Sequence, residues 1–458
     1  MNQIKNKHLL VENGKTELTQ KARKLALQSL EAALNAVDPK RLLHSKLVLE
    51  KSRLQINNFS FDLEKFRNIY VVGGGKASGS MAEALEEILG KQITAGSVNV
   101  PYGSKHETRV VELHEANHPV PDQAGVEGTK RIIEIAEHAE KDDLVICLIS
   151  GGGSSLMPLP RDPISLEDKR QLTNALLKSG ATITEVNTVR KHVSGFKGGW
   201  LAKEAYPATV LNLVLSDVVG DPLASIASGP TVPDPSTFAD ARKVLEKYGL
   251  WANAPSSVRK VLSEGIKGTI EETPKSNDPA FKKVYNVIVG NNRSASNAAV
   301  EYLKSEGLNV LLLTASLEGE AKHVGTVLAS VAREVESSGN PVPRPAGIVV
   351  GGETTVTVTG AGLGGRNQEL ALAAVLKLKG AGACVLASLS TDGVDGPTDA
   401  AGAIVDGDTL EQAAQLGLDA DKFLAENNSY RFFSQLGDLI ITGQTGTNVN
   451  DISVIVVL

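Results

Sequence analysis

Five apolar runs along the chain each end in a burst of glycine and polar residues. A short apolar run closed by glycine is typical of a strand buried on both faces of a parallel sheet. The predicted strands and the loops that follow them are 69–72 with 73–76, 144–149 with 150–155, 211–215 with 216–217, 348–350 with 351–354, and 385–389 with 390–393. Ligands of open α/β sheets bind outside the carboxyl ends of the strands, where glycine lets backbone N–H groups approach an anion. The pattern therefore predicts a small anionic ligand, with a phosphate as the first candidate.

Amphipathic segments lie between these runs. Apolar residues recur at intervals of three and four from Leu18 to Val37, which predicts an opening helix that we expect to pack against the first domain. Further helices are predicted at 81–89, 128–140, 239–248, 294–303 and 370–375. Alternation of strands and helices at this rhythm indicates an α/β fold with a parallel sheet.

With 458 residues, the chain is too long for one ordinary core, so we expect two domains. Residues 1–240 are predicted to form a Rossmann-like α/β domain with a parallel sheet, and 284–458 a second α/β domain. The proline-rich segment 241–283 is predicted to connect them. Residues 356–359 alternate between apolar and polar, which favours a mixed sheet in the second domain. Two apolar runs, 439–442 and 452–457, flank a glycine-rich turn and predict a terminal hairpin.

Composition narrows the class of protein. Hydrophobic residues make up 41% and charged residues 22% of the chain, as in ordinary globular proteins, and the net charge of −6 argues against a large basic surface for nucleic acid. No apolar run is long enough to span a membrane, and the polar N-terminus has no signal core. Cys147 and Cys384 lie in or beside apolar runs, which predicts buried free thiols. We expect a cytoplasmic protein with a small-molecule ligand and neither a nucleic-acid nor a membrane partner; a homodimer stays open.

Two of the loops carry groups suited to anions. Lys76 closes a glycine loop between a strand and a helix, where its ammonium can neutralise phosphoryl oxygens; the alternative is a tight turn with a solvated lysine. The loop is neither a Walker A motif nor a full G-x-G-x-x-G, because Ser78 stands at the last glycine position. The second loop offers donors for a carboxylate or phosphate, although a purely conformational turn is the alternative. It consists of Ser150, Gly151, Gly152, Gly153, Ser154 and Ser155.

Two charged positions are further candidates. Asp217 at a strand end can accept a hydroxyl proton or hold Mg²⁺, or it can cap a helix or turn. Arg366 opens a helix after a glycine loop and can stabilise transferring phosphoryl oxygens, or it can be an exposed arginine near Glu369.

A dense acidic segment and two histidines complete the candidates. Carboxylates at Asp392, Asp395 and Asp399 suggest Mg²⁺ or a hydroxyl-rich ligand, with Asx turns as the alternative. We predict that neither His118 nor His192 is the central base, because a lone histidine is more often structural.

The ordered combination of these motifs resembles the glycerate 2-kinases of the MOFRL type (class II glycerate kinases), over nearly the whole chain. The matching segments are the loop after Val71, 116–121, 150–155, 215–218, 227–231, 351–356, 364–369, 391–393 and 443–448. The resemblance implies two α/β domains with the active site in the cleft between them, the second of them a MOFRL-type domain. It also implies ATP- and Mg²⁺-dependent phosphorylation of D-glycerate at its 2-hydroxyl.

Residue roles follow from the same resemblance. The catalytic candidates are Lys76, Asp217 and Arg366. Substrate and phosphate are expected at Gly74, Gly75, Ser150, Gly151, Gly152, Gly153, Ser154 and Ser155, with the substrate carboxylate against this second loop and Arg366. Nucleotide is expected at Gly351, Gly352, Glu353, Asn367 and Asp392, and Mg²⁺ at Asp217 and Asp392.

Two other functions compete with the kinase. A hydroxypyruvate reductase, an NAD(P)H-dependent 2-hydroxy-acid dehydrogenase, would also handle glycerate-like molecules. It should carry G-x-G-x-x-G with an acidic residue about 20 positions later, and the sequence has no convincing copy. A non-catalytic sugar-acid or nucleotide sensor would bind its ligand without turnover.

Overall fold

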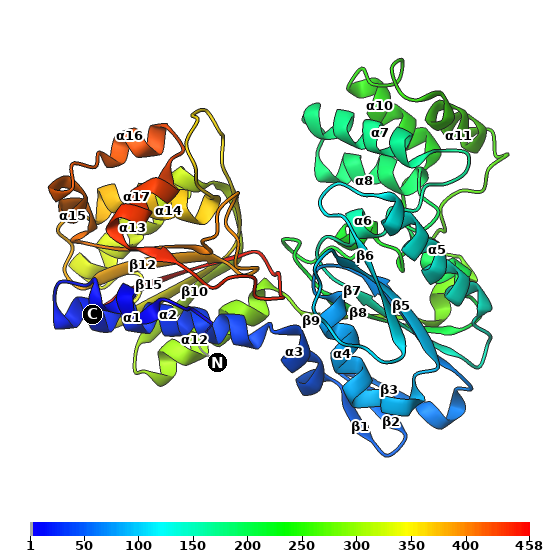
Figure 1. Cartoon of the computed structure of the whole chain (residues 1–458), viewed down its shortest axis with the longest axis horizontal. Coiled ribbons are helices and arrows are strands. Elements are labelled where there is room, and N and C mark those ends of the chain that lie inside the picture. Colours follow the sequence, from blue (N-terminus) through cyan, green and yellow to red (C-terminus); the bar gives the residue numbers. More distant parts are fainter. Residues whose placement is uncertain (1–2) are drawn as a thin grey trace. The chain divides into compact units, whose positions relative to one another are not determined.

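The computed structural model describes residues 3–458 and divides into two units, each containing a six-stranded sheet (Figure 1). We call Pro39–Val289 the inserted unit. The split unit consists of the chain up to Asp38 together with Gly290–Leu458. The inserted unit therefore interrupts the split unit in the sequence, which differs from the expected division into 1–240, 241–283 and 284–458.

The large sheet of the inserted unit is Rossmann-like. Its strand order is β6-β5-β4-β7-β8-β9, and neighbouring strands from β6 to β8 pair in parallel. Since β4 lies in the middle, the order reverses between β4 and β7. The strands are β4 (Ile69–Gly74), β5 (Ala95–Pro101), β6 (Val111–Ala116), β7 (Leu144–Ile149), β8 (Thr209–Leu215) and β9 (Val284–Gly290). The predicted parallel sheet is thereby confirmed.

Helices pack on this sheet where the apolar spacing predicts them. Helix α4 (Ser78–Leu89) contacts β5, and α5 (Gln123–His138) contacts β5 and β6. The core under α5 combines Ile132, Cys147 and Phe196, all fully buried. The unit also contains α3 (Pro39–Lys46), α6 (Gly153–Leu156), α9 (Trp200–Glu204) and a small antiparallel sheet of β1 (Val48–Glu50), β2 (Arg53–Ile56) and β3 (Phe59–Asp62).

Four more helices of the inserted unit share a separate core around Phe238 and Leu262 (green, Figure 1). They are α7 (Leu166–Lys178), α8 (Ile183–His192), α10 (Phe238–Lys247) and α11 (Ser256–Ile266). Capping boxes begin α7, α8 and α10, and these fix where each helix starts. Residues 241–283, which we expected to connect two domains, thus contribute α11 and part of α10 to this core.

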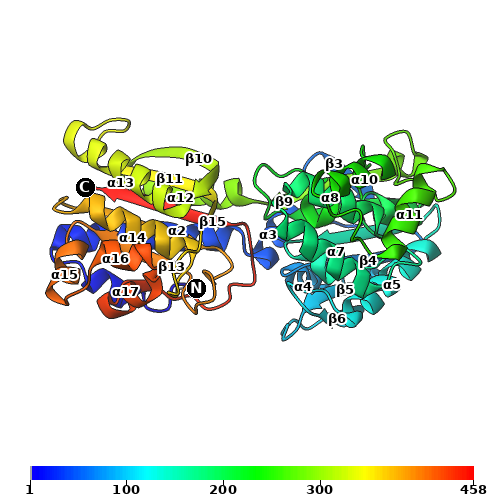
Figure 2. The same ribbon diagram turned by 90° about the horizontal axis from the view of Figure 1, so that it is seen from above.

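The sheet of the split unit is mixed, as expected. Its order is β10-β11-β15-β12-β13-β14; β10 and β11 are parallel, and the remaining neighbours pair antiparallel. Figure 2 shows β15 running through the middle of this unit. The strands are β10 (Asn309–Glu320), β11 (Ala346–Thr355), β12 (Cys384–Ser390), β13 (Gly402–Asp406), β14 (Leu439–Ile440) and β15 (Asp451–Val457).

Helices cover both faces of the mixed sheet (Figure 1). Helix α2 (Glu17–Ala36) contacts α12 (Asn292–Ser305), β12 and β15, while α13 (Ala321–Ser338) and α14 (Arg366–Leu378) pack on the other face. The buried pair Arg23–Asp406, with Nε and Oδ2 2.6 Å apart, ties α2 to β13. The other helices are α1 (Lys7–Glu12), α15 (Thr409–Gln415), α16 (Ala420–Ala425) and α17 (Ser429–Leu436).

Three local predictions for the split unit were wrong. The opening helix packs on this sheet rather than on the first domain, because its apolar face is completed by α12 and β15. The terminal hairpin does not form: β14 pairs with β13, and β15 pairs with β11 and β12. Residues 356–359 leave the sheet, and the backbone N–H of Thr357 donates to Glu320 Oε1 instead of to a strand.

Both cysteines are buried free thiols, as predicted. None of the helices within residues 3–458 combines the length and apolarity needed to cross a bilayer.

Candidate functional site

The inserted unit places two of the predicted loops side by side at the point where the strand order reverses. The carboxyl ends of β4 and β7 are paired, with Gly74 opposite Ile149. The backbone N–H of Lys76 donates to Gly151 O at 2.8 Å, and that of Ala77 donates to Ser150 Oγ at 3.0 Å. This reversal point is where doubly wound sheets bind their ligands. Sequence order alone did not place these two loops in contact.

Glycine is required here because the two loops approach each other closely. An alanine Cβ at Gly75, whose φ is +153°, would overlap Ser150 Oγ. A Cβ at Gly74 would lie 3.0 Å from Met157 Sδ. The glycines therefore have a packing role, and the same close approach leaves the loop backbone near any bound anion.

Lys76, His118 and Gly152 lie together at this position. A Cβ built on Gly152 would lie 2.9 Å from His118 Cδ2 and 3.3 Å from Lys76 Cγ. All three residues are partly buried. His118 is thus a neighbour of Lys76. It was not among the site residues expected from the sequence, although it lies in the matching segment 116–121.

Asp217 is placed at the same edge of the sheet. It follows the last residue of β8 by two positions, and β8 pairs in parallel with β7. Its side chain is partly buried. Lys76, the second loop and Asp217 therefore follow three adjacent strand ends, as their positions in the sequence predict.

The second loop is hydrogen-bonded to a segment with strained backbone, Ala227 and Ser228. Ser154 Oγ and Ser228 Oγ are 2.9 Å apart, and Ser228 Oγ donates to Asn187 Oδ1 at 3.1 Å. Ala227 and Ser228 have positive φ angles of +49° and +60°, which non-glycine residues adopt at a cost of about 1–3 kcal/mol each. Such strain is concentrated at functional sites. Asn187 was not singled out in the sequence, and Ser228 was included only as part of the matching segment 227–231.

Two buried lysines contact the second loop and the residues that follow it. Lys197 Nζ donates to Ser154 O and Met157 O, and Lys169 Nζ donates to Pro158 O and Leu159 O. Burial, and then the charge of Arg190, lower the pKa of Lys169 to about 7. Burial also lowers the pKa of Lys197 well below its ordinary value, with Lys169 and Arg190 adding to the effect. Basic groups are therefore gathered near the second loop, where burial and mutual repulsion disfavour the protonated forms of both lysines.

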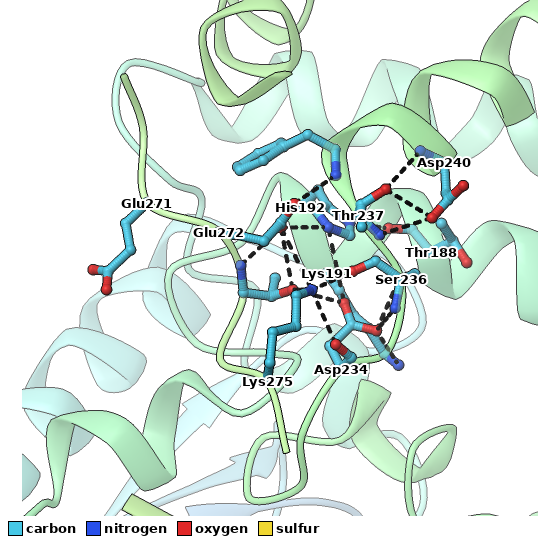
Figure 3. A network of polar contacts seen from close by, with 12 residues as sticks. Thr188, Lys191, His192, Asp234, Ser236, Thr237, Asp240, Glu271, Glu272 and Lys275 are labelled. Atoms are coloured by element: carbon cyan, nitrogen blue, oxygen red, sulfur yellow. Dashed lines mark hydrogen bonds and ion pairs between the residues drawn. The ribbon is translucent and has the colours of Figure 1, made fainter. Parts of the chain in front are cut away.

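A polar network anchors the C-terminal end of α8 nearby (Figure 3). Lys191 Nζ lies 3.4 Å from Asp234 Oδ1, and His192 Nε2 lies 2.9 Å from Glu272 Oε1. Asp234 also accepts from Ser236 and Thr273, so it ties α8 to two loops. Burial opposes ionisation of Glu272, but contact with His192 and two backbone N–H groups lowers its pKa to about 2. These contacts bear out a structural role for His192.

In the split unit, Arg366 is already paired with two carboxylates. Its Nε and Nη2 donate to the two oxygens of Asp451 at 2.6 and 3.0 Å, and Nη1 donates to Glu353 Oε1 at 2.6 Å. Burial raises the pKa of Asp451 to about 7, against the opposing charge of Arg366. From the sequence, Arg366 was expected either to stabilise phosphoryl oxygens or to be an exposed arginine near Glu369, and the bidentate pair with Asp451 was not predicted. Two of the five guanidinium N–H groups remain beyond these bonds.

The glycine loop before α14 packs around an internal carboxylate. Asp395 accepts the backbone N–H groups of Asn367 and Gln368 at 3.1 and 2.9 Å, and it thereby caps α14. A Cβ at Gly365 would overlap this aspartate. Burial raises the pKa of Asp395. Asn367 is buried, donating to Asp395 and accepting from Ser388, so it supports the loop from inside.

The remaining nucleotide candidates of this unit also have internal contacts. A Cβ at Gly351 would overlap Asn292, and one at Gly352 would overlap Leu317 O, so both glycines permit close packing within the unit. Asp392 Oδ1 accepts from Ser390 Oγ and Val394 N, as in an Asx turn.

The predicted acidic cluster is dispersed. Asp395 caps α14, Asp399 accepts from Tyr430 Oη at 2.7 Å, and Asp392 closes its own turn. Within the part of the chain that the structure describes, no three histidine, cysteine, aspartate or glutamate side chains come together as a metal cluster. The two expected metal ligands, Asp217 and Asp392, belong to different units.

Together these features define an α/β protein with a Rossmann-like sheet whose reversal point carries loops suited to anions. Two family models match the chain: one described as a domain of unknown function (DUF4147) matches residues 25–263, most of them in the inserted unit, and one described as the MOFRL family matches 346–451, within the split unit.

Similar proteins cover almost the whole chain. A glycerate 2-kinase from Pyrococcus horikoshii is 42% identical over 95% of this chain and 97% of its own length. A putative hydroxypyruvate reductase from Agrobacterium vitis is 40% identical over 98% of both. The crystal structure of a glycerate kinase from Thermotoga maritima matches with a TM-score of 0.85 at 42% identity, covering 95% of this chain and 99% of the other. The chain belongs to the MOFRL-type glycerate 2-kinase family, which confirms the resemblance.

Proposed function

We propose that this chain is a cytoplasmic glycerate 2-kinase, which transfers the γ-phosphoryl group of ATP to the 2-hydroxyl of D-glycerate and releases 2-phosphoglycerate and ADP. The observation that supports this most is the convergence of Lys76, the second loop and Asp217 on adjacent strand ends in a member of this family. A phosphoryl acceptor needs a group that takes its proton, and the transferred group needs positive charge and N–H donors.

Asp217 orients the 2-hydroxyl of the substrate and accepts its proton as the oxygen attacks the γ-phosphorus. The bond from that phosphorus to the β–γ bridging oxygen breaks, and ADP leaves with the electron pair. Lys76 and Arg366 stabilise the charge on the equatorial oxygens during transfer. Arg366 stabilises this charge with the two guanidinium N–H groups that do not donate to Asp451 or Glu353.

The residues present fit a Mg²⁺ ion that is held mainly by nucleotide phosphates. Such ions commonly use only one or two protein carboxylates, so a cluster of acidic ligands is unnecessary. Asp217 supplies a partly buried carboxylate at the loop edge. Asp392 is a weaker candidate, because one of its oxygens already closes a turn. When bound, the ion neutralises phosphate charge.

The test is a coupled assay with ATP, Mg²⁺ and D-glycerate, read through enolase, pyruvate kinase and lactate dehydrogenase without phosphoglycerate mutase. A signal shows that 2-phosphoglycerate is formed. A signal that requires added mutase shows 3-phosphorylation and overturns the regiochemistry. The Asp217→Asn variant should keep its fold and ATP binding and lose rate. A fall in melting temperature as large as that of a core cavity would instead indicate a structural role.

Hydroxypyruvate reduction is the second candidate, since one relative bears that name. Against it, Ser78 stands where the dinucleotide fingerprint needs its last glycine, and the Ser78 hydroxyl donates to Leu148 O at 3.1 Å. Oxidation of NADH or NADPH by hydroxypyruvate, followed by the absorbance of the reduced nicotinamide, distinguishes the two reactions.

A further inference from the structure

Helix α8 ends in three consecutive basic residues that differ in their partners. Lys191 and His192 face Asp234 and Glu272 in the network of Figure 3. Arg190 has neither a hydrogen bond nor an ion pair with any residue from 3 to 458. The contrast is notable because a guanidinium has five N–H donors and is costly to bury without acceptors.

Arg190 is also partly buried among other cations. Burial lowers its pKa, and its charge in turn lowers the pKa of both Lys169 and Lys197. The ammonium groups of those lysines contact backbone carbonyl oxygens, and no carboxylate of the described chain pairs with them. The three basic groups therefore disfavour one another's protonated forms near the second loop, and an anion bound there would favour those forms.

A second polar group without a partner lies on the same face of α8. Asn187 precedes Arg190 by three positions, so the two side chains are neighbours on the helix surface. Its Oδ1 accepts from Ser228, while its buried Nδ2 has no acceptor among residues 3–458. Asn187 is only 4% exposed, so an unused amide donor at this position carries a desolvation cost. Both side chains thus offer donors next to the Ser154–Ser228 contact.

We propose that Arg190 and the Nδ2 of Asn187 bind the carboxylate of the hydroxy-acid substrate beside Ser154. This assignment rests on the proposed kinase function and names the group that selects an acid over a neutral polyol. The planar guanidinium can hold both carboxylate oxygens at once. Arg366, which we first expected at the carboxylate, already uses its paired donors on Asp451.

The division of labour among the cations follows from their positions. Lys76 lies at the reversal point of the sheet, where a phosphoryl group is expected, and it presents a compact ammonium. Arg190 lies on α8 beside Asn187, and α8 is linked to the other end of the second loop by the hydrogen bonds between Asn187 and Ser228 and between Ser228 and Ser154. The loop thus separates the group that binds the transferred phosphoryl from the groups that bind the acceptor.

The test compares Arg190→Gln and Arg190→Lys with the wild type in steady-state kinetics. In Arg190→Gln, the KM for D-glycerate should rise about a hundredfold, as expected for loss of a charge-assisted contact, with the KM for ATP unchanged. Arg190→Lys keeps the charge but loses the planar fork, so its KM should lie between the two. The preference for glycerate over glycerol should fall in parallel. An unchanged KM for glycerate, or an equal rise in both KM values, would overturn the proposal.

A matched control and a binding measurement make the result specific. Arg242→Gln removes a partly exposed arginine of α10 that pairs with Glu246 and lies over the Trp251 ring, and its kinetics should equal those of the wild type. Titration calorimetry of D-glycerate without ATP should show binding to the wild type and to Arg242→Gln and none to Arg190→Gln, at equal melting temperatures. This result would support the carboxylate site even if turnover were absent, in which case only the kinase proposal would fail. Equal glycerate affinity in all three proteins would contradict the assignment of Arg190.

Asn187→Asp is a second, independent variant. It is nearly isosteric and keeps the oxygen that accepts from Ser228, but it replaces the Nδ2 donor by an anionic oxygen. Repulsion between that oxygen and the substrate carboxylate should weaken glycerate binding at least tenfold, an effect on the order of one lost buried hydrogen bond or more. Tighter or unchanged glycerate binding would show that the carboxylate lies elsewhere.

Discussion

Both units contain glycine-rich loops that precede a helix, but these loops have a different structural role in each unit. In the inserted unit, the glycines bring the backbones of two loops together, as at Gly75 and Ser150. In the split unit, Gly365 makes room for Asp395, whose carboxylate already caps α14. A helix N-terminus attracts an anion, and here the anion is internal. A glycine loop therefore predicts a close approach without specifying what approaches.

The same contrast applies to arginine. Arg366 donates to two carboxylates, whereas Arg190 has no acidic partner among the residues that the structure describes. Sequence reasoning singled out the first because it follows a glycine loop. It did not single out the second, because a basic residue at a helix C-terminus is commonplace. Four predictions test how far this comparison holds.

The largest effects are expected from Gly75→Ala and Gly365→Ala. Each added methyl would overlap neighbouring atoms, at Ser150 and Asp395 respectively, so each should destabilise its own unit by about 3 kcal/mol or more. Hydrogen exchange followed by mass spectrometry should show lost protection in the inserted unit for the first variant and in the split unit for the second. In the control Gly103→Ala, no atom lies within 4 Å and only the positive φ of +80° is strained, so the cost should be about 1 kcal/mol. Comparable costs at all three sites would contradict the packing argument.

Arg366→Ala should lower both stability and rate. Removing the guanidinium leaves Asp451 buried without its cation, which costs about 3–5 kcal/mol of unfolding free energy. Because burial already holds the pKa of Asp451 near 7, the loss should be smaller at pH 5, where that carboxyl is protonated, than at pH 8. Urea unfolding at the two pH values measures this, and kcat should fall about a hundredfold or more. A control, Arg333→Ala, breaks an exposed pair with Glu336 and should change neither quantity appreciably.

Lys76→Ala should lower kcat about a hundredfold or more, with little change in melting temperature. Lys76 is partly exposed at the loop edge, so its truncation opens no large cavity. The exposed Lys91 provides the control variant Lys91→Ala, with unchanged kinetics expected. If Lys76→Ala lowered the free energy of unfolding as much as Arg366→Ala, both side chains would have the same structural role, and the proposed contrast between the two loop regions would be wrong. Near-normal turnover in both variants would instead refute the catalytic assignment.

The smallest effect concerns the pH dependence of stability. The pKa of Lys169 is about 7 in the folded chain and about 10.5 when exposed, so between these values the unfolded chain binds more protons. The free energy of unfolding should therefore rise with pH across this range, by at most about 1.4 kcal/mol per pH unit. Urea unfolding at several pH values should show this rise in the wild type and in the exposed control Lys260→Met, and a flatter dependence in Lys169→Met. An identical slope in all three would show that Lys169 keeps its proton.

Local patterns in the sequence predicted the strands well and their long-range partners poorly. The buried strands β4, β7 and β8 were found because a short apolar run closed by glycine is too short for a core helix and too apolar for a surface loop. Helix α2 was recognised, but amphipathic spacing shows only that one face is apolar and not which sheet covers it. The terminal hairpin was wrong for the same reason: the antiparallel partners of β15 come from β11 and β12, both more distant in sequence than β14.

The placement of the candidate site residues was predictable where these residues follow the ends of strands. Lys76, the second loop and Asp217 each follow one of three adjacent parallel strands. Once those strands are predicted, the three groups are expected at the same edge of the sheet. Asn187 carries no such signal, because it is a single asparagine on a helix. Ser228 belongs to the matching segment 227–231, but its positive φ and its contact with Asn187 are visible only after folding. The pairing of Arg366 with Asp451 joins residues 85 positions apart through a sheet whose pairing the sequence did not reveal.

The insertion of one unit within the other has a consequence for synthesis on the ribosome. All of Pro39–Val289 leaves the exit tunnel before any strand of the split sheet, so the inserted unit can fold first, as domains commonly do during translation. Helix α2 must then wait for α12 and finally for β15, the central strand. Until those last residues emerge, its apolar face is exposed to the cell's chaperones, and we expect nascent chains stalled before Asp451 to bind them.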